Sequence, residues 1–495
     1  MKILYTVIRV LFPESYFNTA FGQAKRKSFV RVSEVVLAFF LLFLFEGGRA
    51  FAASGGNVNI PDANLKAALL ANSAINTNGD GQISNAEAAG YIGILDISNL
   101  GISNLTGIEA FNQLQGLDCN NNSITSADFS GNPQLKRLNC SGNQITALDF
   151  SPNQQLTNLN VSENGLTTLI LGNKPFLDTL SFEFNNLSSV SLSGITSLKY
   201  LSCHTNVLNS LDVSLNSELF YLDCHSNQIS NLNVSSNPNL SVIDCSNNLL
   251  STLSLNSITL LLKLNCSRNQ LVNLDVSENP ALVNLDCSQN QLTSLNVSAI
   301  EALSILHCYN NQLSSLNISS NFALQDLNCE LNQLSTLDFS NNFNLQQLNF
   351  SSNNIEAIDV TSNTLLQSLG CSNNQLTALN LSSNINLSSL DCSHNLLTAI
   401  NLSANFNLYS LICNNNQLSS LNAGLNSILF WLDCSNNQIT SLDVSNNTSL
   451  TRLFCGFNQL NSLDISANTN LTHLNCEGNS IHALDVSTNS NNTYI

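Results

Sequence analysis

The chain has 495 residues, of which 43% are hydrophobic, and a formal net charge of −18. Seven of the 15 Lys and Arg but only three of the 33 Asp and Glu lie in residues 1–52, so the rest of the chain carries 8 basic and 30 acidic side chains and a net charge of −22. Such a surface repels nucleic-acid phosphates and anionic lipid headgroups, which disfavours binding to nucleic acid or to a membrane surface.

Residues 1–52 have the pattern of an export signal. A basic run around Lys25 precedes the apolar stretch Val35–Phe45, and Ala50–Ala52 has the small-residue spacing of a cleavage site. An apolar stretch of about 11 residues suits a signal peptide and is too short to span a membrane. We therefore predict that the mature chain starts near Ala53, is secreted or held at the cell surface, and does not insert into a membrane.

Residues 53–91 are predicted to form a small N-terminal cap. Pro61 and Asp62 favour the start of a short helix. Asn76–Glu87 is similar to an EF-hand calcium loop, although Asn76 replaces the usual Asp. This resemblance implies weak calcium binding, with a dissociation constant of about 10⁻⁴–10⁻³ M. The implied ligands are Asn76, Asn78, Asp80, the carbonyl of Gln82, Ser84 and Glu87. Alternatively, Ser84 and Glu87 form a capping box that starts the next helix.

From about residue 92 the chain consists of a 21-residue repeat, seen clearly at Leu135–Asn153. Each unit contains the same phrase twice, apolar-x-x-apolar-x-apolar-x-x-Asn. The position of Cys140 recurs every 21 residues from Cys119 to Cys476, in 18 copies, and an Asn follows three residues later in every copy. The second Asn position holds Asn in 14 of the 18 copies. The exceptions are Lys174, Ile195, Ile258 and Ile300. A fixed period of about 20 residues is typical of a solenoid.

Both halves of the unit alternate apolar and polar residues, which is the pattern of a short strand with one buried face. One turn cannot bury its apolar face alone, but stacked turns share a continuous core. We predict a mainly β, right-handed solenoid over residues 92–489, with parallel strands on both faces and weak curvature, followed by a tail at 490–495. The Asn residues are expected to bond backbone groups at the buried corners.

These phrases resemble the leucine-rich repeat family, whose unit begins L-x-x-L-x-L-x-x-N/C-x-L, with Cys usually replacing the third Leu here. The 21-residue form is similar to secreted bacterial proteins of the internalin kind. The resemblance implies that the first strand of each unit lines the face that binds a partner.

All 15 cysteines occupy the repeat position that Val161, Phe182 and Phe350 occupy in other copies, so the position is apolar. Cysteines in register on neighbouring strands are about 4.8 Å apart, too far for the disulfide Cβ spacing of about 3.8 Å. We predict buried free thiols rather than disulfides or metal ligands.

Most outward positions of the first strand hold Asp, Asn or Ser, but two clusters differ. The first comprises Tyr200, His204, Tyr221 and His225. The second comprises Ile412, Trp431, Arg452, Phe454 and His473, and includes the single tryptophan of the chain. Aromatic residues and Arg are enriched at binding hot spots, so we predict that both clusters bind ligand, with Trp431 at the centre of the second.

No catalytic constellation or phosphate-binding loop is evident, so we do not expect an enzyme. The predicted function is an extracellular, non-enzymatic scaffold whose sheet binds a protein or a surface glycan. One alternative is a structural surface component that self-associates through its C-terminal end, because no polar cap follows the last repeat. Another is a flat, repetitive binder of the ice-binding type, which would use the Ser/Thr-rich row of the second half, which includes Thr146, Thr167, Thr293, Thr377 and Thr440.

Overall fold

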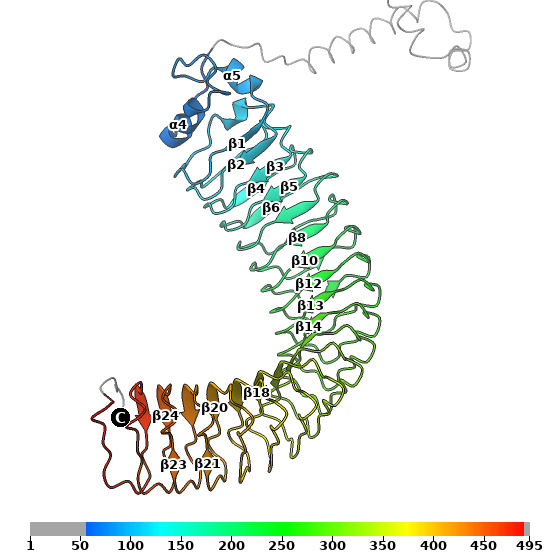
Figure 1. Cartoon of the computed structure of the whole chain (residues 1–495). Coiled ribbons are helices and arrows are strands. Elements are labelled where there is room, and N and C mark those ends of the chain that lie inside the picture. The colour runs from blue at the N-terminus through cyan, green and yellow to red at the C-terminus, as the bar shows by residue number, and fades with distance from the viewer. Residues whose placement is uncertain (1–55, 490–495) are drawn as a thin grey trace, which may run out of the picture.

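The computed structural model describes residues 56–489. The predicted leader, residues 1–52, and the tail, residues 490–495, lie outside this range. The described residues form a small helical cap followed by stacked turns that follow a curved path (Figure 1). The prediction of a mainly β solenoid is confirmed. The proposed domain boundaries stay a prediction.

Two short helices form the cap. Helix α4 (Ala63–Ala71) begins after Asp62, whose Oδ1 accepts hydrogen bonds from the amides of Asn64 and Leu65, both at 3.0 Å. The other carboxylate oxygen of Asp62 accepts from the Ser103 amide at 2.8 Å, which ties the helix to the first turn of the solenoid. Helix α5 (Asn85–Gly90) begins with a capping box. Within residues 56–489, no helix has the length and apolar character needed to cross a bilayer.

A parallel sheet of nineteen three-residue strands forms one face of the solenoid. Each strand pairs with its equivalent one turn later; Leu138, for example, lies opposite Leu117 on one side and Leu159 on the other. The strands are β1 (Ile94–Asp96), β2 (Gly116–Asp118), β3 (Arg137–Asn139), β5 (Asn158–Asn160), β7 (Thr179–Ser181), β8 (Tyr200–Ser202), β10 (Tyr221–Asp223), β12 (Val242–Asp244), β13 (Lys263–Asn265), β14 (Asn284–Asp286), β15 (Ile305–His307), β16 (Asp326–Asn328), β17 (Gln347–Asn349), β18 (Ser368–Gly370), β19 (Ser389–Asp391), β20 (Ser410–Ile412), β22 (Trp431–Asp433), β24 (Arg452–Phe454) and β25 (His473–Asn475), and a 3₁₀ turn, η1 (Ile108–Ala110), lies between β1 and β2.

The second half of the turn is less regular than the sequence predicts. Its leucines are buried as expected, but strands pair there in only three places among the described residues, with one further isolated bridge between Asn296 and Asn317. The pairs are β4 (Ala147–Asp149) with β6 (Thr168–Ile170), β9 (Leu211–Asp212) with β11 (Leu232–Asn233), and β21 (Leu421–Asn422) with β23 (Leu442–Asp443). On this face the alternating pattern therefore predicts which side chains are buried. It does not predict where neighbouring turns form hydrogen-bonded strands.

The prediction of weak curvature is wrong. Figure 1 shows an arc that turns back on itself between β14 and β18, and near the C-terminal end β20 and β24 lie on the inside of the arc while β21 and β23 lie on the outside. A continuous ladder holds neighbouring turns at sheet spacing along the first face only. The second face lacks this restraint along most of its length, so the two faces of a turn can differ in width.

Two columns of Asn side chains run through the corners of the turns. The first Asn column, from Asn122 to Asn479, follows the main sheet; the second Asn column, from Asn132 to Asn489, follows the second half of the turn. In the first column, Asn269 Nδ2 lies 3.0 Å from the carbonyl of Cys245 and 3.1 Å from that of Cys266, and its Oδ1 accepts from the Leu250 amide at 3.0 Å. The expected role of Asn at the buried corners is thus confirmed.

One residue in nearly every turn has a left-handed backbone. It immediately precedes the Asn of the first column and has φ close to +50° even where its side chain is large, as at Phe184 (53°), Leu331 (53°) and Phe457 (54°). Such a conformation is costly for bulky side chains, so the surrounding hydrogen bonds must impose it.

Candidate functional site

Side chains on the solvent-facing side of the main sheet form columns, because every strand pairs in register with the next. Tyr200 lies opposite Tyr221, and Trp431 lies opposite Arg452. The central residue of each strand, Leu in all but β12 where it is Ile243, points into the core, so the residues on either side of it point outward. The sheet thus brings together residues 21 positions apart in the sequence.

The first predicted cluster is assembled as expected. The rings of Tyr200 and Tyr221 stack with centroids 4.3 Å apart and planes 6° apart. The rings of His204 and His225 stack at 4.2 Å and 15°. Phe184, which the sequence interpretation missed, meets the His204 ring edge-on at 5.0 Å.

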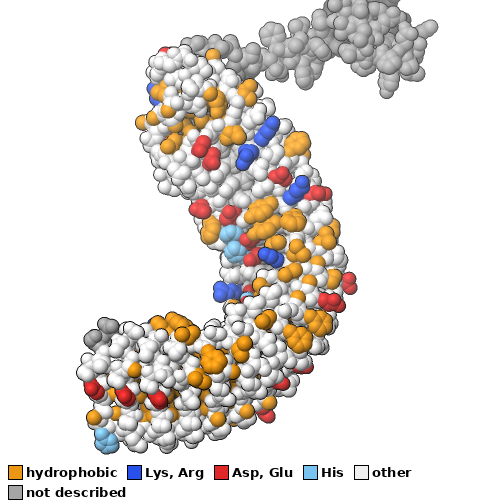
Figure 2. Space-filling view, in the orientation of Figure 1, with side chains coloured by type: hydrophobic (Ala, Val, Ile, Leu, Met, Phe, Trp, Pro, Cys, Tyr) orange, Lys and Arg blue, Asp and Glu red, His pale blue; other side chains and the backbone are white. Residues whose placement is uncertain are grey.

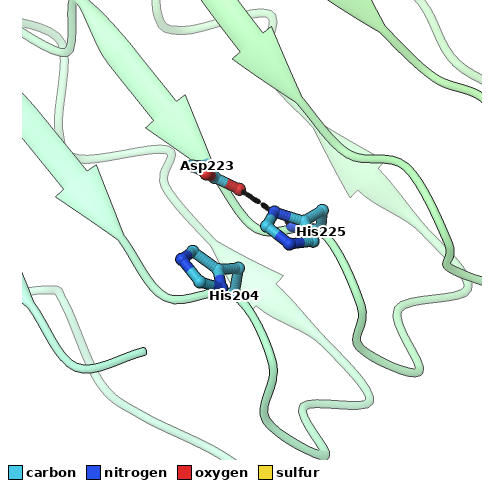
Figure 3. A group of neighbouring side chains, drawn as sticks. All are labelled: His204, Asp223 and His225. Atoms are coloured by element: carbon cyan, nitrogen blue, oxygen red, sulfur yellow. Dashed lines mark hydrogen bonds and ion pairs between the residues drawn. The ribbon is translucent and has the colours of Figure 1, made fainter. Parts of the chain in front are cut away.

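Asp223 is the second residue that sequence reasoning missed, and it organises the cluster. Its Oδ1 lies 2.6 Å from His225 Nδ1. Figure 3 shows this hydrogen bond and the His204 ring beside it. Burial favours the neutral form of Asp223, but hydrogen bonds from His225 outweigh this effect and hold the pKa of the carboxyl below its ordinary value. The same hydrogen bond raises the pKa of His225, whereas burial lowers the pKa of His204. The two stacked imidazoles therefore differ in proton affinity.

The second predicted cluster lies on β20, β22, β24 and β25. The Arg452 guanidinium carbon lies 5.2 Å from the centroid of the Trp431 ring, within the range of a cation–π contact. His473 follows Arg452 in the same column, while Ile412 and Phe454 flank Asp433 in the neighbouring column. The five residues thus occupy two adjacent columns instead of a single row. All are half-buried except Arg452, which is exposed.

Two further aromatic residues extend this second cluster. Tyr409 and Phe430 stack with centroids 4.9 Å apart and planes 8° apart, at the position just before the strand. The backbone amide of Trp431 bonds the Tyr409 carbonyl at 3.2 Å, which places the pair at the edge of the cluster. Aligning the repeats column by column, including this position, would have identified them. The Trp431 Nε1 atom is buried and has no hydrogen-bond partner among the described residues.

A shallow hollow of about 620 Å³ lies on the main sheet between β15 and β19. Its lining is mainly polar, although the exposed Leu331 also lines it, and His307 Nε2 lies 3.3 Å from Asp326 Oδ2 at one side. Unlike the second cluster, this hollow has no exposed aromatic side chain in its lining. Figure 2 shows the basic side chains of the visible face confined to the N-terminal half of the arc, away from the C-terminal end.

The predicted calcium loop is built largely around Glu87. One carboxylate oxygen accepts from the Ser84 amide at 2.9 Å, and the other accepts from the Thr77 amide at 2.9 Å. The Ser84 hydrogen bonds are the main reason that the pKa of Glu87 falls to about 2. Glu87 is thus satisfied without an ion, as the capping-box alternative requires. By contrast, Asn76 Oδ1 is buried and has no partner among the described residues, which suits a ligand atom.

Asn78 and Asp80 bond each other, since Asp80 Oδ2 accepts from Asn78 Nδ2 at 3.0 Å, and Asp80 Oδ1 accepts from the Gln82 amide at 2.8 Å. The loop is therefore ordered by its own hydrogen bonds. Calcium binding stays a prediction.

All 15 cysteines are free thiols, as predicted, and fourteen are buried. Burial raises the pKa of Cys140 and Cys329 to about 12. Cys476 is partly exposed, because within the described residues no strand follows β25 to cover it.

Comparisons with known proteins agree with this architecture. Residues 112–153 match the family described as leucine-rich repeats (2 copies). The functional domain of InlJ from Listeria monocytogenes, described as including a cysteine ladder, is 27% identical, with 84% of this chain and 80% of that chain covered and a TM-score of 0.54.

The chain has the fold of a leucine-rich repeat solenoid. Its 21-residue units and its column of cysteines fit the bacterial, internalin-like kind.

Two more distant structures share this fold. LIC12759 from Leptospira interrogans is 23% identical, with coverage of 74% and 97% and a TM-score of 0.63. A plant peptide hormone receptor, RGFR1, in complex with RGF2, is 22% identical, with coverage of 75% and 68% and a TM-score of 0.68. Comparison with curated proteins gives no match.

Proposed function

We propose that this leucine-rich repeat protein is an extracellular, non-enzymatic scaffold that binds another protein or a surface glycan through the outer face of its main sheet. Solenoids of this family commonly serve protein binding and recognition, and the main sheet offers a long surface of outward side chains. The export signal predicted in residues 1–52 supports an extracellular location.

The observation that carries the proposal is the pairing of Trp431 with Arg452. Elsewhere the outward columns mostly hold small polar residues, which stay hydrated at little cost. Here a half-buried indole lies under a guanidinium, with Ile412 and Phe454 in the adjacent column. Aromatic residues and Arg dominate the energetics of protein interfaces. The unpaired, buried indole N–H costs about 1–3 kcal/mol. A ligand that supplied an acceptor after moving Arg452 aside would remove that cost.

The test is a pull-down from the surroundings of the producing cell with the mature chain, followed by affinity measurements on variants. Trp431→Ala should weaken binding by about 2 kcal/mol or more, roughly thirtyfold, and leave the melting temperature nearly unchanged. Gln347→Ala is the matched control, because Gln347 occupies the equivalent exposed position on β17. Equal affinities for the wild type and Trp431→Ala would contradict the placement of the site and direct attention to the Tyr200–His225 cluster.

A further inference from the structure

His204, Asp223 and His225 bring three metal-ligating side chains together on the main sheet. One ligand atom from each lies within 4.8 Å of the others, and in residues 56–489 no other group of three His, Cys, Asp or Glu side chains is this close. We propose that His204, Asp223 and His225 bind a divalent transition-metal ion of the Zn²⁺, Cu²⁺ or Ni²⁺ class. This site is independent of ligand binding at Trp431.

The register of the sheet sets the position of the three side chains. Strands β8 and β10 pair so that Ser202 lies opposite Asp223, and the two histidines follow two residues later on neighbouring turns. The backbone amide of Thr205, next to His204, bonds the carbonyl of His225 at 3.0 Å. Both histidines are thus held on adjacent turns, and Asp223 lies just before His225 on the same turn. The backbone register thus holds the three side chains at neighbouring positions of the sheet.

The donor set favours a transition metal over calcium. Imidazole nitrogen with one carboxylate suits Zn²⁺, Cu²⁺ and Ni²⁺, whereas Ca²⁺ takes six to eight oxygen ligands. In the structure Asp223 Oδ1 and His225 Nδ1 are 2.6 Å apart, bridged by a proton. An ion at that point would take the place of the proton between the two groups, and His204 would supply a third ligand from the side (Figure 3).

Binding requires a modest rearrangement of the histidine rings. Metal–nitrogen and metal–oxygen distances are about 2.0–2.2 Å, so the three donors have to move closer, and the nearly parallel rings have to tilt toward one ion. Both rings are partly buried and stacked on each other, and a hydrogen bond between Nδ1 and Thr205 Oγ1 at 3.1 Å holds the polar edge of His204. Binding of the ion must therefore offset the loss of this stacking.

The charge around the site also favours a cation. Glu183 occupies the position of His204 one turn earlier, and its Oε2 is buried without a hydrogen-bond partner among the described residues. Asp244 lies opposite Asp223 one turn later. A buried carboxylate oxygen that lacks a donor is costly, and a nearby ion would relieve that cost. Glu183 and Asp244 therefore add negative charge next to His204.

The other histidines of the sheet provide an internal comparison. His307 pairs with Asp326 alone, and His394 contacts the side-chain amide of Asn415. A His–Asp pair therefore forms elsewhere without a third ligand. Only the turns at His204 and His225 add the second imidazole.

The experiment is titration of the metal-free mature chain with Zn²⁺ by calorimetry and with Co²⁺ by visible absorption. The wild type should bind one equivalent. His204→Gln and His225→Gln should each weaken binding at least tenfold. His394→Gln, an exposed histidine on another turn, should bind like the wild type. Circular dichroism of each variant confirms folding, and if His225→Gln fails to fold, His204→Gln carries the test.

Two results would overturn the proposal. One is binding of equal strength in His204→Gln and the wild type. The other is a cobalt spectrum with the intense near-ultraviolet band of thiolate ligation, which would place the ion on cysteines. Absence of any binding at millimolar metal would refute the site as well.

Discussion

The two Asn columns place an asparagine at both corners of most turns, but the hydrogen bonds of that asparagine differ between the two columns. In the first column Asn269 donates to three carbonyls and accepts from the Leu250 amide. In the second column Asn279 donates to the carbonyls of Leu255 and Ile258, at 3.2 and 2.8 Å, and its Oδ1 has no partner among the described residues. The Oδ1 atom is likewise buried without a partner among the described residues in thirteen of the fourteen asparagines of this column.

This difference explains why the two positions vary differently within one chain. The first column is Asn in all 18 units, because no other side chain both donates and accepts in that geometry. The second column accepts Ile195, Ile258 and Ile300, each fully buried, because an apolar side chain there removes an unsatisfied oxygen together with two donors. The corner that follows the main sheet is thus strictly specified, and the other corner is specified mainly by burial.

The largest effect expected from this comparison is on thiol reactivity, because the cysteines lie beside the first column. Burial raises the pKa of a thiol such as Cys140 from 9.0 to about 12, which lowers its thiolate fraction at pH 8 by roughly a thousandfold. In the native protein a thiol reagent should react readily with Cys476 alone, and with all 15 thiols after denaturation. Rapid reaction of several thiols in the native state, or recovery of disulfides, would contradict a closed first corner.

Substitution of one Asn in each column tests the comparison directly. Asn269→Ala should lower the free energy of unfolding by about 3 kcal/mol or more, because it leaves a buried amide and three carbonyls without their partner. Asn279→Ala should cost about 1–2 kcal/mol, and Asn279→Ile, which copies a neighbouring unit, less than that. Urea unfolding followed by circular dichroism measures these values. Equal losses at Asn269 and Asn279 would mean that the unpaired Oδ1 does not matter.

Lys174 sharpens the comparison, because it replaces Asn in the second column. Its side chain is fully buried, and its Nζ donates to the Phe150 carbonyl at 2.7 Å. Burial lowers the pKa of this amine from its ordinary 10.5, so the protonated form destabilises the fold. That penalty is present below the folded-state pKa and disappears as the pH rises through 10.5. Lys174→Asn should therefore stabilise the protein at pH 7 by about 1 kcal/mol, and by less at pH 10.

The control for this prediction is Lys263→Asn, since Lys263 is exposed on β13 and its removal should change stability little. Urea unfolding of both variants at pH 7 and pH 10 gives the comparison. A Lys174→Asn protein that is less stable than the wild type at pH 7 would show that the lysine is a better corner residue than asparagine.

The cap has neither Asn column, so calcium binding there would change stability without involving either corner of the repeat. If the loop binds the ion with a dissociation constant of about 1 mM, then 10 mM calcium should stabilise the cap by about 1.4 kcal/mol. Melting curves with calcium and with chelator, for the wild type and for Asp80→Ala, measure the shift. A shift in neither protein would leave the capping box of Ser84 and Glu87 as the full explanation of this sequence.

Much of the architecture could be predicted from the sequence, because the apolar positions of the repeat are the buried positions of the turn. The core leucines, the thiols and the pairing of Trp431 with Arg452 all follow from a strict 21-residue period. Strand pairing on the second face could not be predicted, because alternation looks the same whether or not a ladder forms. The left-handed residue of each turn could not be predicted from the sequence either, because bulky residues such as Phe184 and Leu331 rarely adopt that conformation.

The candidate site was predictable to a similar extent. Outward columns identified His204 and His225, but Asp223 resembled the many other Asp residues of the Leu-Asp phrase. Its special position depends on which side chain lies two residues later, and that contact appears only in three dimensions. The arc likewise depends on the unequal width of the two faces, which no single unit encodes.

The in-register stacking has a consequence for how such a protein can change its length. Tyr221 and Trp431 occupy the same column ten units apart, and the register of strand pairing in the main sheet is the same in every turn between them. Excision of any one complete unit between them would leave each remaining strand facing an equivalent neighbour. The two clusters would then move closer by one strand spacing, about 4.8 Å along the sheet, while their internal geometry stayed intact. The number of 21-residue units between the two clusters therefore sets the distance between them, and that distance can change in steps of one unit.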